Sequence, residues 1–134
     1  MAGKHHLKEL EKELQEQLDK FKKIQRELQK VVSSRQQLET QKKESEIVKE
    51  ELDYLEDGTN VYKLVGPALI KQELAEAKAT VLKRLEYIGG EIERVEKTIK
   101  DVDKRLHSNR EKVMKLQSQC HVAQQAHQRK QQRS

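Results

Sequence analysis

The chain has 134 residues, of which 38% are charged and 34% hydrophobic, and it contains no Trp and a single Phe. This composition argues against a wide, layered core, and the bias toward Lys, Glu, Gln and Leu favours long helices with a narrow apolar seam. The net charge of +5 is modest, and basic and acidic residues alternate along most of the chain, which is typical of solvated helical faces.

The first half of the chain predicts a helix from about residue 5 to 56. Polar groups interrupt its seam at Gln17, Arg35, Lys42 and Ser45, and we expect the helix to end near "EDGTN", where Gly58 supplies a left-handed residue. The apolar seam positions follow three-four spacing and resume after a skip of one residue, giving Leu7, Leu10, Leu14, Phe21, Ile24, Leu28, Val31 and Leu38, then Val48, Leu52 and Leu55.

The connecting segment "NVYKLVGPALIKQ", residues 60–72, predicts a β-hairpin because a Gly-Pro pair separates two short apolar runs. A hairpin is marginal by itself, and its edges carry unpaired backbone groups, so we expect it to pair with hairpins of other chains. An irregular loop packed on the helix ends is the alternative. The expected assembly residues are Val61, Tyr62, Lys63, Leu64, Val65, Gly66, Pro67, Ala68, Leu69, Ile70 and Lys71.

The second half predicts a helix from about residue 73 to 128 that folds back antiparallel on the first, with facing residue numbers that sum to about 127. Of fifteen seam positions from Leu74 to Ala123, thirteen are apolar, and the exceptions are Lys78 and Asn109. This unbroken heptad repeat specifies a left-handed coiled coil, in which a lone Asn typically fixes the register.

Two further features of the second half leave alternatives open. Gly89 and Gly90 lie just off the seam. They either form a flexible point in the helix or are tolerated there at a cost in helix stability of about 1 kcal/mol each. Residues 129–134 predict a disordered basic tail, for which contact with nucleic acid or an acidic partner is the alternative.

The hairpin with its flanks, "VYKLVGPALIKQELAEAKATVLKRLEYI" and "SRQQLETQKKESEIVKEEL", resembles the β-class subunits of prefoldin over about residues 7–125. The resemblance implies a single domain over residues 1–134, whose hairpin joins a β-barrel platform in a hexamer of two α-class and four β-class subunits. It further implies that the coiled-coil tips hold unfolded actin and tubulin for the cytosolic group II chaperonin, without a nucleotide or other cofactor.

The tips implied by this resemblance are the residues near both termini. Apolar surface there would hold many different unfolded sequences, because such surface adapts to its ligand, and coiled-coil ends fray. The alternative is that these residues only close the coil. The candidates are Leu7, Leu10, Leu14, Val113, Met114, Leu116, Cys120, Val122 and Ala123.

Enzymatic, metal-binding and membrane functions find no support in the sequence. His5 and His6 are adjacent, so they point in different directions on a helix, and no phosphate-binding loop is present. One cysteine, no apolar run of ~18 residues and no signal peptide favour a reducing, cytoplasmic location. Two functions remain: a non-enzymatic co-chaperone subunit that binds neither nucleic acid nor membrane, and a structural coiled-coil adaptor or scaffold subunit without clients.

Overall fold

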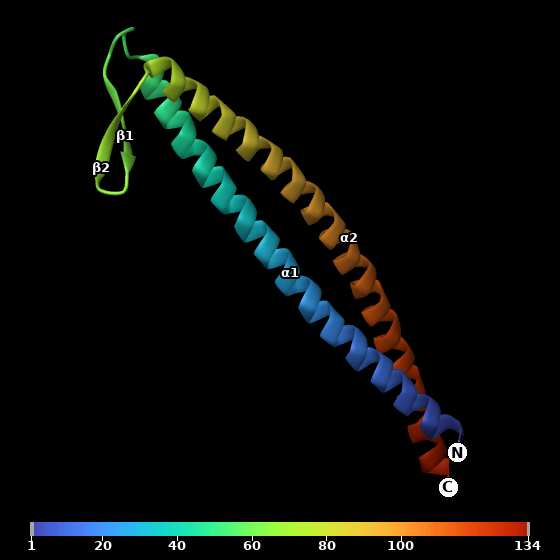
Figure 1. Ribbon diagram of the computed structural model, residues 1–134. Coiled ribbons are helices and arrows are strands. Elements are labelled where there is room, and N and C mark those ends of the chain that lie inside the picture. Colours follow the sequence, from blue (N-terminus) through green and yellow to red (C-terminus); the bar gives the residue numbers. More distant parts are fainter. Residues whose placement is uncertain (1, 134) are drawn as a thin grey trace. The chain divides into compact units, whose positions relative to one another are not determined.

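The computed structural model describes residues 2–133, which form helix α1 (Ala2–Asp53), strands β1 (Val61–Val65) and β2 (Ala68–Gln72), and helix α2 (Leu74–Arg133) (Figure 1). This order confirms the predicted mainly α fold with a hairpin between two long helices. The chain divides into two compact units. The hairpin unit is Val32–Lys97, and the terminal unit comprises the residues up to Val31 and those from Thr98 onward.

The hairpin of the hairpin unit lies within the segment for which the sequence predicts it. β1 and β2 pair antiparallel, from Val61 opposite Gln72 to Val65 opposite Ala68, so that only Gly66 and Pro67 form the loop. Gly66 has φ of 58°, and the proline ring fixes the φ of Pro67 near −65°, which together fit a type II′ turn. A side chain at Gly66 would be strained at this positive φ.

The two helices of the hairpin unit meet in an apolar cluster close to the strands. Buried Leu52 of α1 packs with buried Leu74, Ala77 and Val81 of α2, and Val61 of β1 packs against the same cluster. Further along the unit, Arg35 Nη2 lies 3.0 Å from Glu96 Oε1 across the two helices. These pairs confirm the antiparallel arrangement within this unit.

The end of α1 differs from the prediction. The helix stops at Asp53, and Gly58, with φ of 87°, lies five residues further on rather than at the helix end. There it serves a separate turn, in which the Thr59 backbone N–H donates to the Glu56 carbonyl oxygen at 3.1 Å. The left-handed conformation of Gly58 was therefore predicted correctly, but the glycine shapes the turn after α1 and does not end the helix.

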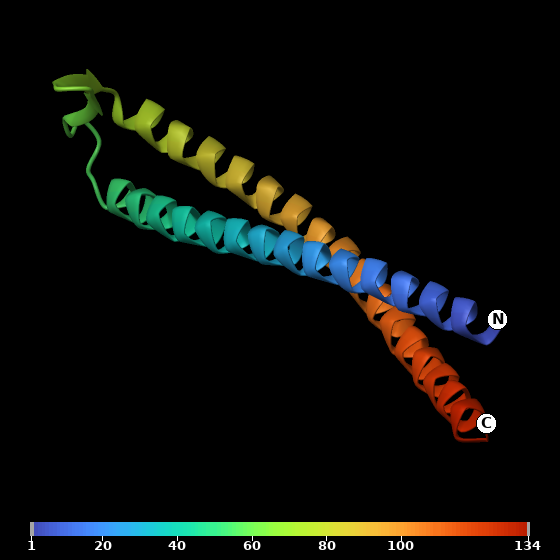
Figure 2. The same ribbon diagram turned by 90° about the horizontal axis from the view of Figure 1, so that it is seen from below.

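The terminal unit has a second apolar cluster between the same two helices. Ile24 of α1 packs with Val102 and Leu106 of α2, and Phe21 and Leu28 flank them. Val102 is the most completely buried large side chain described, with 1% of its surface exposed. Towards the termini the ends of α1 and α2 diverge, as Figure 2 shows.

The seam positions predicted on α2 are confirmed, because all fifteen are buried or half-buried. On α1 the predicted skip is wrong. The seam continues without interruption through buried Ser45, half-buried Lys49 and buried Leu52, whereas Val48 is 43% exposed and Leu55 37%. A lysine can occupy such a position because its aliphatic stem packs while its ammonium group reaches water.

The predicted disordered tail is also corrected, because α2 continues through Arg133; Ser134 lies outside the described residues. The segment "QQAHQRKQQR" is rich in helix-forming Gln, Ala, Arg and Lys and contains neither Gly nor Pro to end the helix. Gly89 and Gly90 lie within continuous α2, and a Cβ on either would meet nothing within 4 Å. Their role as a flexible point stays a prediction.

Candidate interaction surfaces

The hairpin exposes its apolar side chains to solvent. The fractions exposed are 69% for Leu64 and 68% for Leu69, although leucine is normally among the most buried residue types. Tyr62, Val65 and Ile70 are also about half exposed. We call these five residues the hairpin surface, and all eleven residues predicted for assembly lie in the two strands and their turn.

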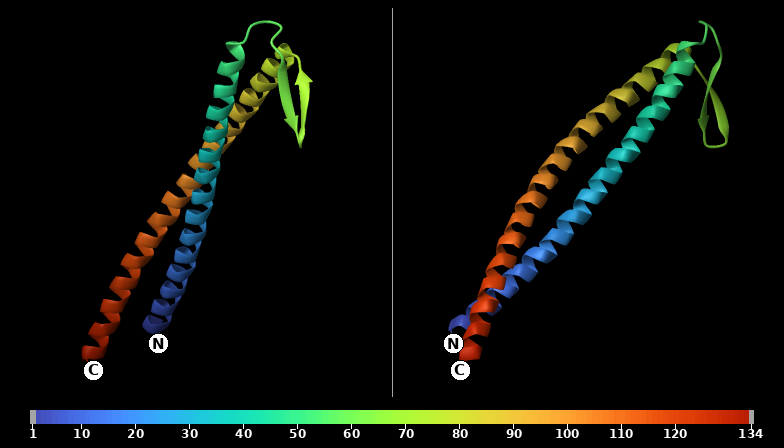
Figure 3. Two further views of the ribbon diagram at one scale, coloured as in Figure 1. Left: turned by 90° about the vertical axis from the view of Figure 1, so that its left-hand side faces the viewer. Right: turned by 180° about the vertical axis from the view of Figure 1, so that it is seen from behind.

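The two faces of the hairpin differ in what they contact. Opposed residues share a face, and successive residues alternate, so Tyr62, Leu64 and Leu69 lie on one face and Val61 on the other. Val61 packs against the helical cluster of the hairpin unit, which anchors the hairpin at its base. From there the turn points back alongside the helices (Figure 3). Val65 and Ile70 share the face of Val61 but are about half exposed, so both faces of the hairpin offer apolar side chains to a partner.

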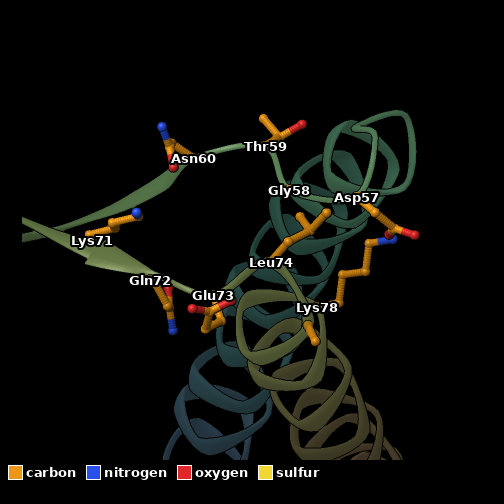
Figure 4. Close-up of a pocket in the computed structure, with 10 residues that line it drawn as sticks. Asp57, Gly58, Thr59, Asn60, Lys71, Gln72, Glu73, Leu74 and Lys78 are labelled. Atoms are coloured by element: carbon orange, nitrogen blue, oxygen red, sulfur yellow. The ribbon is translucent and has the colours of Figure 1, made fainter.

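A shallow polar hollow of about 330 Å³ lies between the base of the hairpin and the start of α2 (Figure 4). Asp57, Lys71, Glu73 and Lys78 contribute charged side chains to its wall. Figure 4 shows the Lys78 side chain extending toward Asp57, so this seam lysine of α2 contributes its charge to the wall of the hollow. The hollow brings together charges that water can solvate and offers no enclosed space for a reaction.

The nine candidate tip residues separate into two groups. Leu10, Val113 and Cys120 are buried in the terminal unit, and Leu7, Leu14, Leu116 and Ala123 are half-buried. Only Met114 and Val122 are exposed, at 63% and 62%. The structure therefore places seven of the nine in the seam and two on the surface of α2.

Met114 and Val122 belong to a stripe that the sequence analysis missed. Ser118 and Ala126 are also exposed, and the four residues follow one another at intervals of four along α2. Residues four apart lie on one helical face, and this face is opposite the seam positions Val113 and Cys120. The four-residue spacing was the available signal. We call Met114, Ser118, Val122 and Ala126 the outer stripe.

The seam of the terminal unit contains one polar pair. Asn109 is only 3% exposed, and its Nδ2 donates to Gln17 Oε1 at 2.8 Å and to the Gln17 carbonyl oxygen at 3.3 Å. Its Oδ1 is buried without a hydrogen-bond partner among the described residues. The two polar positions predicted separately, Gln17 and Asn109, thus satisfy each other across the helices, at the cost of one unpaired oxygen.

Replacing Asn109 and Gln17 together by leucine should raise the free energy of unfolding by about 1–3 kcal/mol, because the unpaired buried oxygen is removed and apolar contact is gained. Chemical denaturation followed by circular dichroism measures the change. Asn109→Leu alone is the control, and it should gain less because the Gln17 side chain then lacks its partner. A double variant less stable than the wild type would contradict this account.

Cys120 is buried at a seam position, and this burial raises the pKa of its thiol, with the Glu11 carboxylate adding to the effect. The thiolate is the reactive form of cysteine, so the folded chain keeps Cys120 protonated and unreactive at neutral pH. Cys120 acts here as a small apolar side chain that closes the seam.

Cys120 should also make the stability depend on pH in the alkaline range. The unfolded thiol ionises near its usual pKa of 9.0, whereas the folded thiol does so only at higher pH. The stabilisation is therefore complete below 9.0 and is lost as pH rises through the folded pKa. Urea midpoints measured across this range should fall more steeply for the wild type than for Cys120→Ala. Equal slopes would contradict the assignment.

Among residues 2–133 no group of three or more His, Cys, Asp or Glu side chains is placed to hold a metal ion. None of the helices described is both long and apolar enough to cross a membrane.

The fold agrees with comparisons to known proteins. The prefoldin subunit family model matches residues 15–120, so this chain belongs to the prefoldin subunit family. Among curated relatives, the chain is similar to prefoldin subunit 6 of Mus musculus, with 45% identity over 87% of this chain and 92% of that protein. Prefoldin subunit 6 of Arabidopsis thaliana is 40% identical over 88% of this chain and 92% of its own.

Solved structures show the same fold. The crystal structure of the prefoldin β subunit from Thermococcus strain KS-1 superimposes with a TM-score of 0.72, covering 77% of this chain and 90% of that one at 23% identity. The resemblance to β-class prefoldin subunits that the hairpin and its flanks predicted is confirmed.

Proposed function

We propose that this chain is a non-enzymatic co-chaperone subunit of a hetero-hexameric prefoldin complex. It assembles through its hairpin with α-class and β-class subunits, captures unfolded actin and tubulin at its coiled-coil tip, and delivers them to the group II chaperonin of the cytoplasm. The whole chain acts as one domain, without cofactor, nucleic acid or membrane. The observation that carries the proposal is the exposed apolar hairpin surface.

Assembly follows from the energetics of that surface. Fully burying a leucine side chain is worth about 1.5–3 kcal/mol, and Leu64 and Leu69 leave most of this unused in the isolated chain. Both strand edges also carry unpaired N–H and C=O groups, which strands of neighbouring subunits would satisfy. A β-barrel platform built from several hairpins meets both needs, because closure leaves no edge.

Client capture is supported by the terminal unit. The outer stripe exposes Met114 and Val122, and methionine adapts to irregular apolar partners. Leu7, Leu14 and Leu116 lie half-buried in the seam of the same unit, whose helix ends diverge. Opening the last turns would add these residues to the surface offered to an unfolded chain, because helix termini are the least stable parts.

Native mass spectrometry of the complex formed in the cytosol tests the assembly. One copy of this 15.7 kDa chain in a six-membered complex is expected. A monomer or a plain homodimer would refute it. Suppression of denatured-actin aggregation by the purified complex tests client capture independently.

A structural adaptor without clients is the second candidate, and the full or partial burial of seven of the nine tip residues favours it. The two functions differ in one measurement. A hexamer that assembles normally and fails to suppress aggregation of denatured actin or tubulin would identify the adaptor.

A further inference from the structure

The positive charge of the chain is concentrated at one end. The first 109 residues hold 22 basic and 22 acidic side chains, whereas residues 110–134 hold six Lys or Arg and one acidic residue, Glu111. From Lys112 onward the sequence has no Asp or Glu at all. The whole net charge of +5 therefore belongs to the last part of α2, which lies in the terminal unit.

Part of this charge lies on the same helical face as the outer stripe. Lys115, Val122 and Arg129 are spaced by seven residues, which is about two helical turns, and Arg133 follows Arg129 by four. All four side chains are exposed. The face opposite the seam thus presents the apolar Met114 and Val122 together with three cations.

Ordinary structural roles account for only part of the pattern. Lys130 and Arg133 in the last turn interact favourably with the negative end of the helix dipole, but Lys112 and Lys115 are too far from that end, because the effect is confined to the last turn. Helix α1 does not supply a matching negative surface either. Between residues 4 and 13 it carries three Lys and three Glu.

We propose that the helical face formed by the outer stripe and these three cations selects non-native protein segments in which apolar residues are flanked by Asp or Glu. The inference rests on the proposed function and adds a substrate class to it. Met114 and Val122 contact the apolar residues, and Lys115, Arg129 and Arg133 attract the flanking carboxylates. Complementary charge also speeds encounter and discourages segments of the wrong sign.

A nucleic acid is the less suitable ligand for this face. Single-stranded nucleic acids are held by a basic groove combined with aromatic side chains on which bases stack. The sequence has no Phe, Tyr or Trp beyond Tyr87. The exposed Met114 and Val122 would have no equivalent partner on a phosphate backbone.

Two fluorescein-labelled, unstructured peptides test the proposal on the prefoldin complex reassembled with the full chain. They share the same apolar residues and differ only in having Glu or Lys between them. By fluorescence anisotropy at about 0.05 M salt, we expect the Glu peptide to bind roughly tenfold more tightly, and the difference to shrink at about 0.5 M because salt screens exposed charges.

The triple variant Lys115→Gln, Arg129→Gln, Arg133→Gln should lose most of this preference while still suppressing actin aggregation. The matched control, Lys97→Gln, Lys100→Gln, Lys104→Gln, removes three exposed charges earlier on α2 and should keep the preference. Equal binding of both peptides by a complex that suppresses aggregation would overturn the selectivity alone. Binding of neither, without suppression, would overturn the proposed function as well. Tighter binding of single-stranded DNA than of the Glu peptide would also overturn the selectivity.

Discussion

Replacing Leu64 and Leu69 by lysine should leave the helices folded and abolish assembly into the hexamer. The two residues oppose each other across the strands, and both are about two-thirds exposed. The substitutions therefore change the stability of the isolated chain little. In the complex they remove about 1.5–3 kcal/mol of assembly free energy for each leucine that would be buried, and they place ammonium groups in the interface. Native mass spectrometry of the mixed subunits, with circular dichroism for helix content, measures both effects.

Leu82→Lys is the matched control for this experiment. Leu82 is also an exposed leucine of the hairpin unit, at 47%, but it lies on α2 rather than in a strand. Assembly should be unchanged in this variant if the hairpin surface is the interface. A hexamer of normal mass and stability formed by the Leu64 and Leu69 variant would show that the hairpin is not the assembly device.

The seam of α2 could be predicted from sequence because it depends on a short-range, uninterrupted repeat, from Leu74 to Ala123. The α1 seam was harder, because Ser45 and Lys49 occupy seam positions, and their polarity suggested a skip that the backbone does not make. Hydropathy alone does not show that a lysine stem packs while its charge reaches water. The prediction of a disordered tail was wrong for a similar reason, because it gave the polar composition of the segment more weight than its helix propensity.

The turn of the hairpin could be predicted because Gly66 and Pro67 permit few turn geometries. The burial of the candidate tip residues was harder to predict. The period of the apolar pattern indicates which residues face the partner helix, but it does not indicate how far toward the termini the two helices stay packed together. Cys120 is still buried in the seam, and among the candidate tip residues only Met114 and Val122 of the outer stripe are exposed.

Removing residues 1–12 and 118–134 should abolish suppression of client aggregation and leave the hexamer intact. The deletion takes Leu7 and Leu10 from α1, and Cys120, Val122 and Ala123 from α2, all within the terminal unit. The hairpin and its anchoring cluster belong to the hairpin unit and are untouched. Light scattering of denatured actin diluted into wild-type or trimmed complex measures the holding activity.

A point variant separates the loss of apolar surface from the loss of length. Met114→Gln with Val122→Gln keeps the full helices and the buried seam, because both side chains are exposed. It should weaken holding, though less than the deletion, since the half-buried Leu7 and Leu14 remain available when the ends open. If the trimmed complex still prevents aggregation as well as the wild type, clients are held elsewhere on the assembly. If the deletion abolishes holding and the point variant holds clients as well as the wild type, the client-binding surface is instead formed by the seam residues that fraying exposes.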